Sequence, residues 1–287
     1  MAVEARLPAA TAGTARHARR RDWVMLVCAT FIILVVAIAL LAPLLAPHDP
    51  TRVDILASFQ GPSASHPLGT DSLGRDLLSR LMYGARLSLF GPALIVVIAT
   101  VLGTLLAISA AWMGGWFDSV SSRILDILFA FPGLIFALLA VALFGPGLVA
   151  PVIALSIAYL PYDARVLRSV AMRERNLPYI QACYVEGLPT RTITVRHLLP
   201  NILPFVIVQA TISFGYALVD LAAVSYLGLG VAPPAAEWGL MVANGQASIL
   251  TGHPQESIYA GLLIIATVVA FNLLGDRLAT RFSVQAQ

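Results

Sequence analysis

The stretch VMLVCATFIILVVAIALLAPLLA, Val24 to Ala46, runs for 23 residues without a charged side chain. A bilayer core needs about 20 apolar residues in a helix, so this stretch is long enough to cross a membrane. A secretory signal peptide has an apolar core of only about 7–15 residues, and we therefore interpret 23–46 as a retained transmembrane helix. The whole chain agrees, because 59% of its 287 residues are hydrophobic and only 11% are charged.

Further crossings are predicted from charge-free stretches of similar length. The 36 residues between Asp126 and Asp163 are too many for one crossing, so Gly145-Pro146-Gly147 is expected to turn a hairpin there. The turn after the second crossing is expected near Gly114, and Pro132 is interpreted as a packing kink. The sequence thus predicts an all-α membrane protein with six transmembrane helices, at 24–46, about 87–110, two within 127–162, His197 to Asp220, and Glu256 to Asp276.

The placement of arginine predicts the orientation. All 18 cationic side chains are arginine, and there is no lysine, which excludes a P-loop on this chain. With the N-terminus inside, Arg52, Arg75, Arg80 and Arg86 lie outside and the other 14 (18 minus 4) lie inside. The positive-inside rule then places both termini in the cytoplasm. We attribute the pI of about 9.1 to this orientation and not to nucleic-acid binding.

Cys28 and Cys183 have no CxxC spacing and no histidine cluster, so neither a disulfide framework nor a metal site is predicted.

These crossings divide the chain into segments. The predicted segments are a cytoplasmic tail 1–22, a transmembrane helix 23–46, an extracytoplasmic segment 47–86, a five-helix core 87–278 and a tail 279–287. Within the core, a cytoplasmic loop is expected at about 169–200 and an outer loop at about 221–257.

The inner loop is punctuated like two short helices. YIQACYVE at 179–186 has helix-compatible spacing, and Gly187 is expected to close that helix in the left-handed conformation. Pro189 is expected to open a second helix that stops before Pro200. Composition alone allows another interpretation, an amphipathic element that lies on anionic lipid.

Acids inside a membrane cost about 2.5–3.5 kcal/mol at mid-helix on insertion scales, so they are usually functional. Asp126 and Asp163 are expected near the ends of their crossings, and Asp220 at the end of the fifth, where this cost is lower. A proton relay is therefore not favoured. A secondary transporter stays open as an alternative, although no mid-span acid or internal repeat indicates one. A structural or sensing membrane subunit is a second alternative.

Four stretches of the chain match sequence motifs of a known family. The loop YIQACYVEGLPTRTITVRHLLPN at 179–201 is similar to the EAA loop of ABC importer permeases, although Gln181 replaces the usual Glu and Cys183 the second Ala. The pattern is matched at Ala182, Gly187, Ile193, Leu199 and Pro200. The other three motifs are HPLGTDSLGRDLLSRLMYGARLSL at 66–89, SYLGLGVAPPAAEWGLM at 225–241 and FNLLGDRL at 271–278. These three resemble the second permease subunit of the dipeptide, oligopeptide and nickel importers of the ABC type.

The resemblance implies the type I ABC importer permease fold in a bacterial cytoplasmic membrane. It also implies a heterodimer with a homologous permease, cytoplasmic ATPase subunits and an extracytoplasmic substrate-binding protein. ATP and Mg²⁺ would be bound by the partner subunits, so this chain is expected to carry no cofactor, catalytic residue or metal ligand. The expected cargo is a di- or oligopeptide, with nickel or glutathione as alternatives.

Two groups of residues are expected to contact these partners. The inner loop would fit a groove on the ATPase, where the small side chains of Ala182 and Cys183 allow close approach and Gly187 permits the chain reversal. The coupling residues are predicted to be Tyr179, Gln181, Ala182, Cys183, Glu186, Gly187, Arg191, Ile193, Arg196 and Pro200.

The outer motifs would form a surface that receives the binding protein. Asp71, Arg75, Asp76 and Arg80 are spaced so that charges can pair along a helix, which alternatively indicates only a solvated face at the interface. The docking residues are predicted to be Gly69, Asp71, Gly74, Arg75, Asp76, Gly228, Gly230, Pro233, Pro234 and Trp238.

Overall fold

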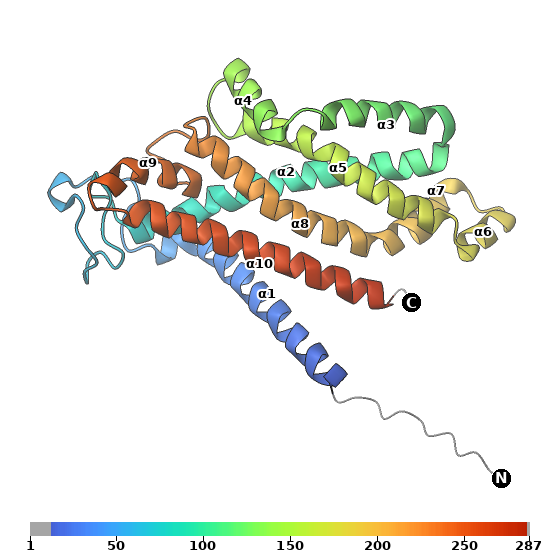
Figure 1. Ribbon diagram of the computed structural model, residues 1–287, viewed down its shortest axis with the longest axis horizontal. Coiled ribbons are helices and arrows are strands. Elements are labelled where there is room, and N and C mark those ends of the chain that lie inside the picture. Colours follow the sequence, from blue (N-terminus) through green and yellow to red (C-terminus); the bar gives the residue numbers. More distant parts are fainter. Residues whose placement is uncertain (1–12, 286–287) are drawn as a thin grey trace, which may run out of the picture.

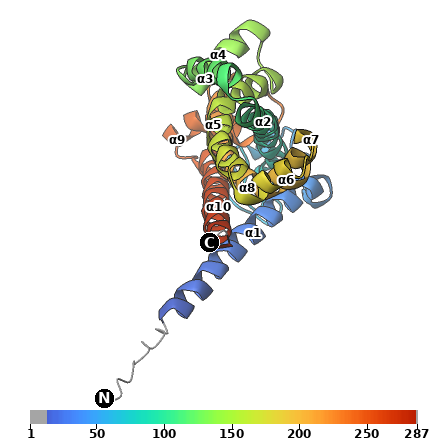
Figure 2. The ribbon, with the colours of Figure 1, turned by 90° about the vertical axis from the view of Figure 1, so that its right-hand side faces the viewer.

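The computed structural model describes residues 13–285, which form a helical bundle without a named strand in that range. Its long helices α2 (Leu77–Met113), α5 (Val149–Arg175), α8 (Leu199–Tyr226) and α10 (Gln255–Gln285) run along the longest axis (Figure 1). Helix α1 (Gly13–Leu45) crosses this bundle and diverges from it toward its own beginning (Figure 2). The predicted all-α class is confirmed.

Five helices are long and apolar enough to cross a membrane, and they correspond to five of the six predicted crossings. The break near Pro132 is larger than the packing kink that we expected, because α3 (Gly115–Phe129) and α4 (Gly133–Phe144) meet at 79°. Pro132 precedes α4, and a proline restricts the residue before it and donates no N–H, so the helix breaks there. Counting the bent pair as one span gives six.

The predicted turns are confirmed. Gly114 and Gly115 separate α2 from α3 with φ of +55° and +47°, in the region that favours glycine. The hairpin at Gly145-Pro146-Gly147 lies between the end of α4 and the beginning of α5.

Several helices extend beyond the predicted crossings, because the limits of a charge-free stretch are not the limits of a helix. Helix α2 begins at Leu77, inside the segment 47–86, and its 37 residues exceed the bilayer thickness. Residues 13–22 of the predicted tail belong to α1, and α10 continues past 279 to Gln285. Residues 1–12 and 286–287 of the two predicted tails lie outside the described range. The predicted outer loop 221–257 contains the helix α9 (Trp238–Leu250).

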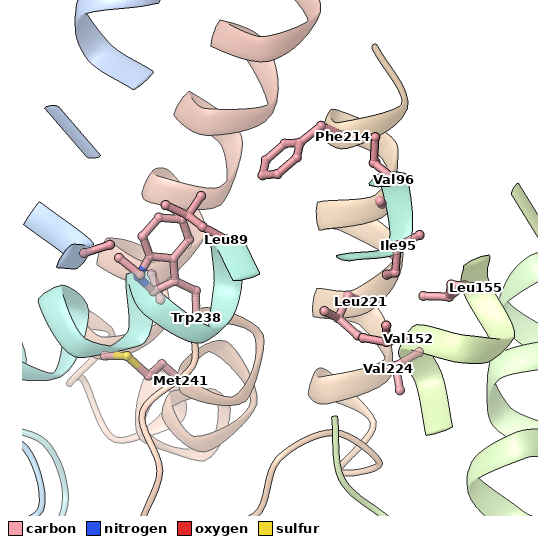
Figure 3. Packing of buried hydrophobic residues seen from close by; sticks show 14 of the residues in the cluster. Leu89, Ile95, Val96, Val152, Leu155, Phe214, Leu221, Val224, Trp238 and Met241 are labelled. Atoms are coloured by element: carbon pink, nitrogen blue, oxygen red, sulfur yellow. The ribbon is translucent and has the colours of Figure 1, made fainter. Parts of the chain in front are cut away.

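The main core lies where α2, α5, α8 and α9 meet (Figure 3). Ile95 of α2, Leu155 of α5 and Leu221 of α8 are almost completely buried there, and Trp238 of α9 fills the adjoining space. Many large apolar side chains on the outside of the bundle are exposed, as expected for a surface that contacts lipid.

The bundle has two ends that carry the predicted site residues. We call residues 178–198 the elbow; they comprise α6 (Pro178–Val185), α7 (Thr190–Ile193) and the π-helical turn Thr194–Leu198. We call residues 47–80 and 227–241 the lip, which includes the short 3₁₀ helix Ile55–Ala57. Elbow and lip lie at opposite ends, and α1 begins and α10 ends toward the elbow (Figure 1).

Candidate functional site

The elbow is closed by the glycine that the sequence predicted. Gly187 has a φ of +77°, and its N–H donates to the carbonyl of Tyr184 at 3.0 Å. The N–H of Leu188 donates to the carbonyl of Cys183 at 3.1 Å. These two bonds form a Schellman motif, which satisfies the last carbonyls of α6 and fixes the chain reversal.

The second part of the elbow does not stop before Pro200, so that prediction is wrong. Residues Thr194–Leu198 form a π turn, the N–H of Leu199 donates to the carbonyl of Thr194, and α8 follows without interruption. Pro200 lies in the first turn of α8, where a missing N–H is tolerated. The second part of the elbow, from Thr190 onward, and α8 therefore form one continuous helical element.

The inner side of the elbow is packed against the bundle. Ile180, Cys183 and Ile193 are buried in a cluster with Ile108 of α2 and Ala171 of α5. The expectation that Cys183 lies at the partner-facing surface is wrong, because it follows Ile180 by three residues and shares its buried side. Cys183 and Ile193 support the elbow from within.

The outer side of the elbow is free of the bundle. Val185 is 91% exposed, although an apolar side chain gains nothing from contact with water. Nothing lies within 4 Å of the position that a Cβ would take at Gly187. The predicted coupling residues that are exposed are Gln181, Ala182, Glu186, Gly187, Arg191, Arg196 and Pro200.

Polar contacts hold the elbow to its neighbours. The hydroxyl of Tyr179 donates to Glu174 Oε1 and accepts from Asn201 Nδ2, both at 2.6 Å. Burial, together with the hydrogen bond to Glu174, raises the pKa of Tyr179 to about 12, so the hydroxyl keeps its proton at neutral pH. The guanidinium of Arg175 lies 5.1 Å from the centre of the Trp112 ring. Because α2, α5 and α8 are all joined to the elbow, a displacement of the elbow would reach each of them.

The charges of the lip are buried, so their interpretation as a solvated face is wrong. Asp71 Oδ1 accepts the N–H of Leu73 and of Arg75, both at 2.9 Å, and its Oδ2 accepts Arg75 Nε at 2.6 Å. Arg80 Nε lies 3.4 Å from the same Oδ2. These residues pair across a turn and not along a helix, because α2 begins only at Leu77.

Glu237 and Trp238 join the two halves of the lip. The carboxylate of Glu237 accepts the N–H groups of Gly239 and Leu240 at 2.9 Å and caps α9, while Ser88 Oγ of α2 donates to it at 3.0 Å. Trp238 Nε1 donates to the carbonyl of Leu81 at 3.0 Å. Sequence reasoning missed Glu237, because the usual capping residues are Ser, Thr, Asp and Asn.

The predicted docking residues therefore fall into two groups. Three of them, Gly228, Pro233 and Pro234, are exposed. The others shape the lip from within; at Gly74, for example, a Cβ would come within 1.7 Å of the carbonyl oxygen of Asp54. The buried members are Gly69, Asp71, Gly74, Arg75, Asp76, Gly230 and Trp238. Docking of a binding protein at the lip stays a prediction.

Asp163 was expected near a helix end, and that expectation is wrong. It lies near the middle of α5 and is completely buried. Its carboxylate accepts hydrogen bonds from Gln209 Nε2 at 2.9 Å and from Thr100 Oγ1 and Ser213 Oγ at 3.0 Å. The carboxylate thus connects α5 to α2 and α8.

The other two acids, Asp126 and Asp220, lie near the ends of their helices α3 and α8. Asp126 forms an ion pair of 2.7 Å with Arg165 of α5, and both side chains are more than half exposed. Asp220 accepts a hydrogen bond of 2.8 Å from the hydroxyl of Tyr159. Arg123 lies one helical turn before Asp126, but Asp126 pairs with Arg165 because α5 lies alongside α3.

Replacing Asp163 with leucine is expected to destabilise the bundle. Three buried donors would lose their acceptor, each at about 1–3 kcal/mol before relaxation, so we expect the melting temperature to fall by about 5 °C or more. Asp163→Asn keeps one acceptor and should be less harmful. Thermal denaturation of the purified chain in detergent measures both, with Asp126→Asn as the exposed control. Equal melting temperatures for wild type and Asp163→Leu would refute the connecting role.

Two family models match the chain. Residues 99–284 match the binding-protein-dependent transport system inner membrane component, and residues 14–62 match the N-terminal transmembrane domain of oligopeptide transport permease C. The fold agrees: a structure of the MetNI methionine ABC transporter in an inward-facing conformation aligns with a TM-score of 0.55 over 72% of this chain and 96% of that chain. The identity to that structure is 20%, so this likeness concerns the fold alone.

Similar sequences include permeases for two kinds of cargo. The glutathione transport system permease protein GsiD of Pectobacterium atrosepticum is 38% identical over 90% of this chain and 86% of its own length. The dipeptide transport system permease protein DppC of Alkalihalophilus pseudofirmus is 39% identical over 85% of this chain and 80% of its own length. The family implies ATPase and substrate-binding partners in a membrane setting, and its permease subunits are not ATPases themselves. The chain therefore belongs to the binding-protein-dependent transport system inner membrane components and is a multi-pass permease subunit of an ABC importer.

Proposed function

We propose that this permease imports di- or oligopeptides as one half of a heterodimer with a homologous permease, driven by ATP hydrolysis on partner subunits. The observation that carries the proposal is the elbow: a helical turn fixed by a Schellman motif, anchored to three long helices and exposed at its tip. Such an element can transmit a force without bending itself.

The proposed mechanism follows from these contacts. The elbow end lies in the cytoplasm, as the arginine distribution predicts, and its exposed side fits a groove on an ATPase subunit. When the ATPases close on nucleotide, the elbows of the two permeases are drawn together. Because α8 continues from the elbow, it pivots with it and the path changes from inward-open to outward-open.

The proposed cargo rests on the relatives, whose names include dipeptide and glutathione permeases. Glutathione is itself a tripeptide, so both names describe short peptides. A groove of about 1120 Å³ lies between α1 and α2 near the lip. It is lined mainly by apolar and aromatic side chains, and the charged residues Arg86 and Asp49 also line it. We infer that this groove is one wall of the path, which the second permease completes.

Substitution at Val185 tests the coupling role. Val185→Asp changes a side chain that is 91% exposed, so the fold should persist, whereas a carboxylate in an apolar contact should prevent the ATPase from binding. We expect the ATPase to be lost from the purified complex or its stimulated hydrolysis to fall more than about 10-fold, which corresponds to 1.4 kcal/mol.

Leu250→Asp is the matched control, because Leu250 is also 91% exposed but lies at the end of α9, away from the elbow. This variant should retain the ATPase. If Val185→Asp and Leu250→Asp both assembled with the ATPase and hydrolysed ATP like the wild type, the elbow would not be the contact.

A further inference from the structure

Two histidines and an aspartate from separate segments meet at the lip. His48 follows α1, His66 lies in the loop that precedes α2, and Asp76 caps the first turn of α2. His66 Nδ1 lies 3.0 Å from Asp76 Oδ1, and His48 Nδ1 lies 4.0 Å from Asp76 Oδ2. The two imidazole rings are 4.7 Å apart between centroids. Each residue offers a ligand atom, and these atoms lie within 4.8 Å of one another.

One of these ligand atoms has no hydrogen-bond partner. His48 Nδ1 is buried, and no donor or acceptor bonds to it, although the Asp76 carboxylate is nearby. Buried nitrogens of this kind are normally satisfied. A cation next to the carboxylate would give the imidazole nitrogen a partner, which a protein hydrogen bond over 4.0 Å does not.

The three side chains are held in place by their surroundings. The N–H of His48 donates to Ser79 Oγ at 3.1 Å, which fixes the chain after α1 against the first turn of α2. Asp76 Oδ2 accepts from the N–H of Ser79 at 2.8 Å and from its hydroxyl at 2.6 Å. Hydrogen bonds of this kind orient the ligands of a metal site.

The spacing suits a transition-metal ion. Tetrahedral coordination with bonds of about 2.0–2.2 Å places neighbouring ligand atoms about 3.4 Å apart. The separations of 3.0 Å from His66 Nδ1 to Asp76 Oδ1 and of 4.0 Å from His48 Nδ1 to Asp76 Oδ2 lie on either side of that value. They involve the two different carboxylate oxygens, so the side chains have to rotate toward one another to share one ion. Two imidazoles and one carboxylate favour zinc, cobalt, nickel or copper over magnesium or calcium, which take oxygen ligands.

We propose that His48, His66 and Asp76 bind one divalent transition-metal ion at the lip, with a water molecule or another ligand at the fourth position. The side chains of His48 and His66 are 32% and 17% exposed, which leaves one side of the site open to solvent. The ion joins the end of α1 to the beginning of α2. Sequence reasoning expected no metal, because positions 48, 66 and 76 match no ligand motif and only the folded loop brings them together.

The test uses the full chain, purified with a tag that contains no histidine, treated with EDTA and then titrated with Zn²⁺ or Co²⁺. We expect one tightly bound ion per chain by elemental analysis, a visible Co²⁺ spectrum of tetrahedral type, and a higher melting temperature with Zn²⁺. His48→Ala should weaken affinity at least about 100-fold, because loss of a supporting residue alone costs 10–100-fold. His66→Ala should do the same.

Two controls keep the result interpretable. In EDTA, His48→Ala should melt like the wild type, because the Nδ1 atom of its ring makes no hydrogen bond. His253→Ala, whose ring stacks on Phe59 with centroids 4.4 Å apart, should bind Zn²⁺ like the wild type. The proposal is overturned if the wild type binds no stoichiometric ion, or if the ion and its effect on melting persist in both His48→Ala and His66→Ala. His66 and Asp76 would then form only a hydrogen bond.

Discussion

Replacement of Trp238 with alanine is expected to lower the free energy of unfolding by about 3–5 kcal/mol, the range for large aromatic truncations in a packed core. Trp238 is 1% exposed, and its ring lies beside Gly84 of α2, where an added Cβ would be 3.1 Å from Trp238 Cδ1. The variant also removes the hydrogen bond from Trp238 Nε1 to the carbonyl of Leu81. Helix α9 should therefore detach from α2, and the lip should lose its shape.

The matched control is Trp116→Ala, because Trp116 is 78% exposed. Chemical or thermal denaturation of both variants in the same detergent gives the comparison. We expect the melting temperature to fall by about 10 °C for Trp238→Ala and to change little for Trp116→Ala. Similar small changes in both variants would mean that α9 is held by other contacts.

The second large effect is expected for Arg80. Its guanidinium is completely buried and lies 3.4 Å from Asp71 and 3.9 Å from Glu256, so Arg80→Met leaves two buried carboxylates with less compensating charge. Breaking a buried ion pair from one side typically costs about 3–5 kcal/mol. Loss of the hydrogen bond from Arg80 Nη1 to the carbonyl of Pro50 adds to this. Thermal denaturation should detect a fall comparable to that for Trp238→Ala.

A double variant separates charge from packing. Arg80→Met combined with Glu256→Gln removes one of the stranded charges and should recover part of the lost stability. Arg86→Met serves as the control, because Arg86 is an exposed arginine on the same helix. No recovery in the double variant, or an equal loss in Arg86→Met, would show that Arg80 does not act through charge compensation.

The sequence predicts the number and type of the crossings better than their ends. Charge-free length marks the part of a helix that faces lipid, and α1, α2, α5, α8 and α10 follow from it. It does not mark where a helix ends in protein contacts, so the extension of α2 to Leu77 and the whole of α9 were missed. The break at Pro132 was underestimated, because a proline kink and a 79° bend have the same local signal.

In the candidate sites too, features with a local cause were predictable and features that depend on distant segments were not. Gly187 was predictable, because a left-handed residue after a helix and before a proline has a local cause. The burial of Asp71 and Arg80 depends on distant segments, which no local pattern contains. Asp163 was misplaced for a similar reason: its donors come from α2 and α8, 63 and 46 residues away along the chain.

The central claim is that this permease is a gate moved by ATPase partners through its elbow. The most direct measurement is uptake of a labelled dipeptide into vesicles that contain either this chain alone or the chain with its second permease, ATPases and binding protein. We predict accumulation against the gradient only in the complete system with ATP, and none with the chain alone under an imposed proton gradient. Uphill accumulation by the chain alone would contradict the account.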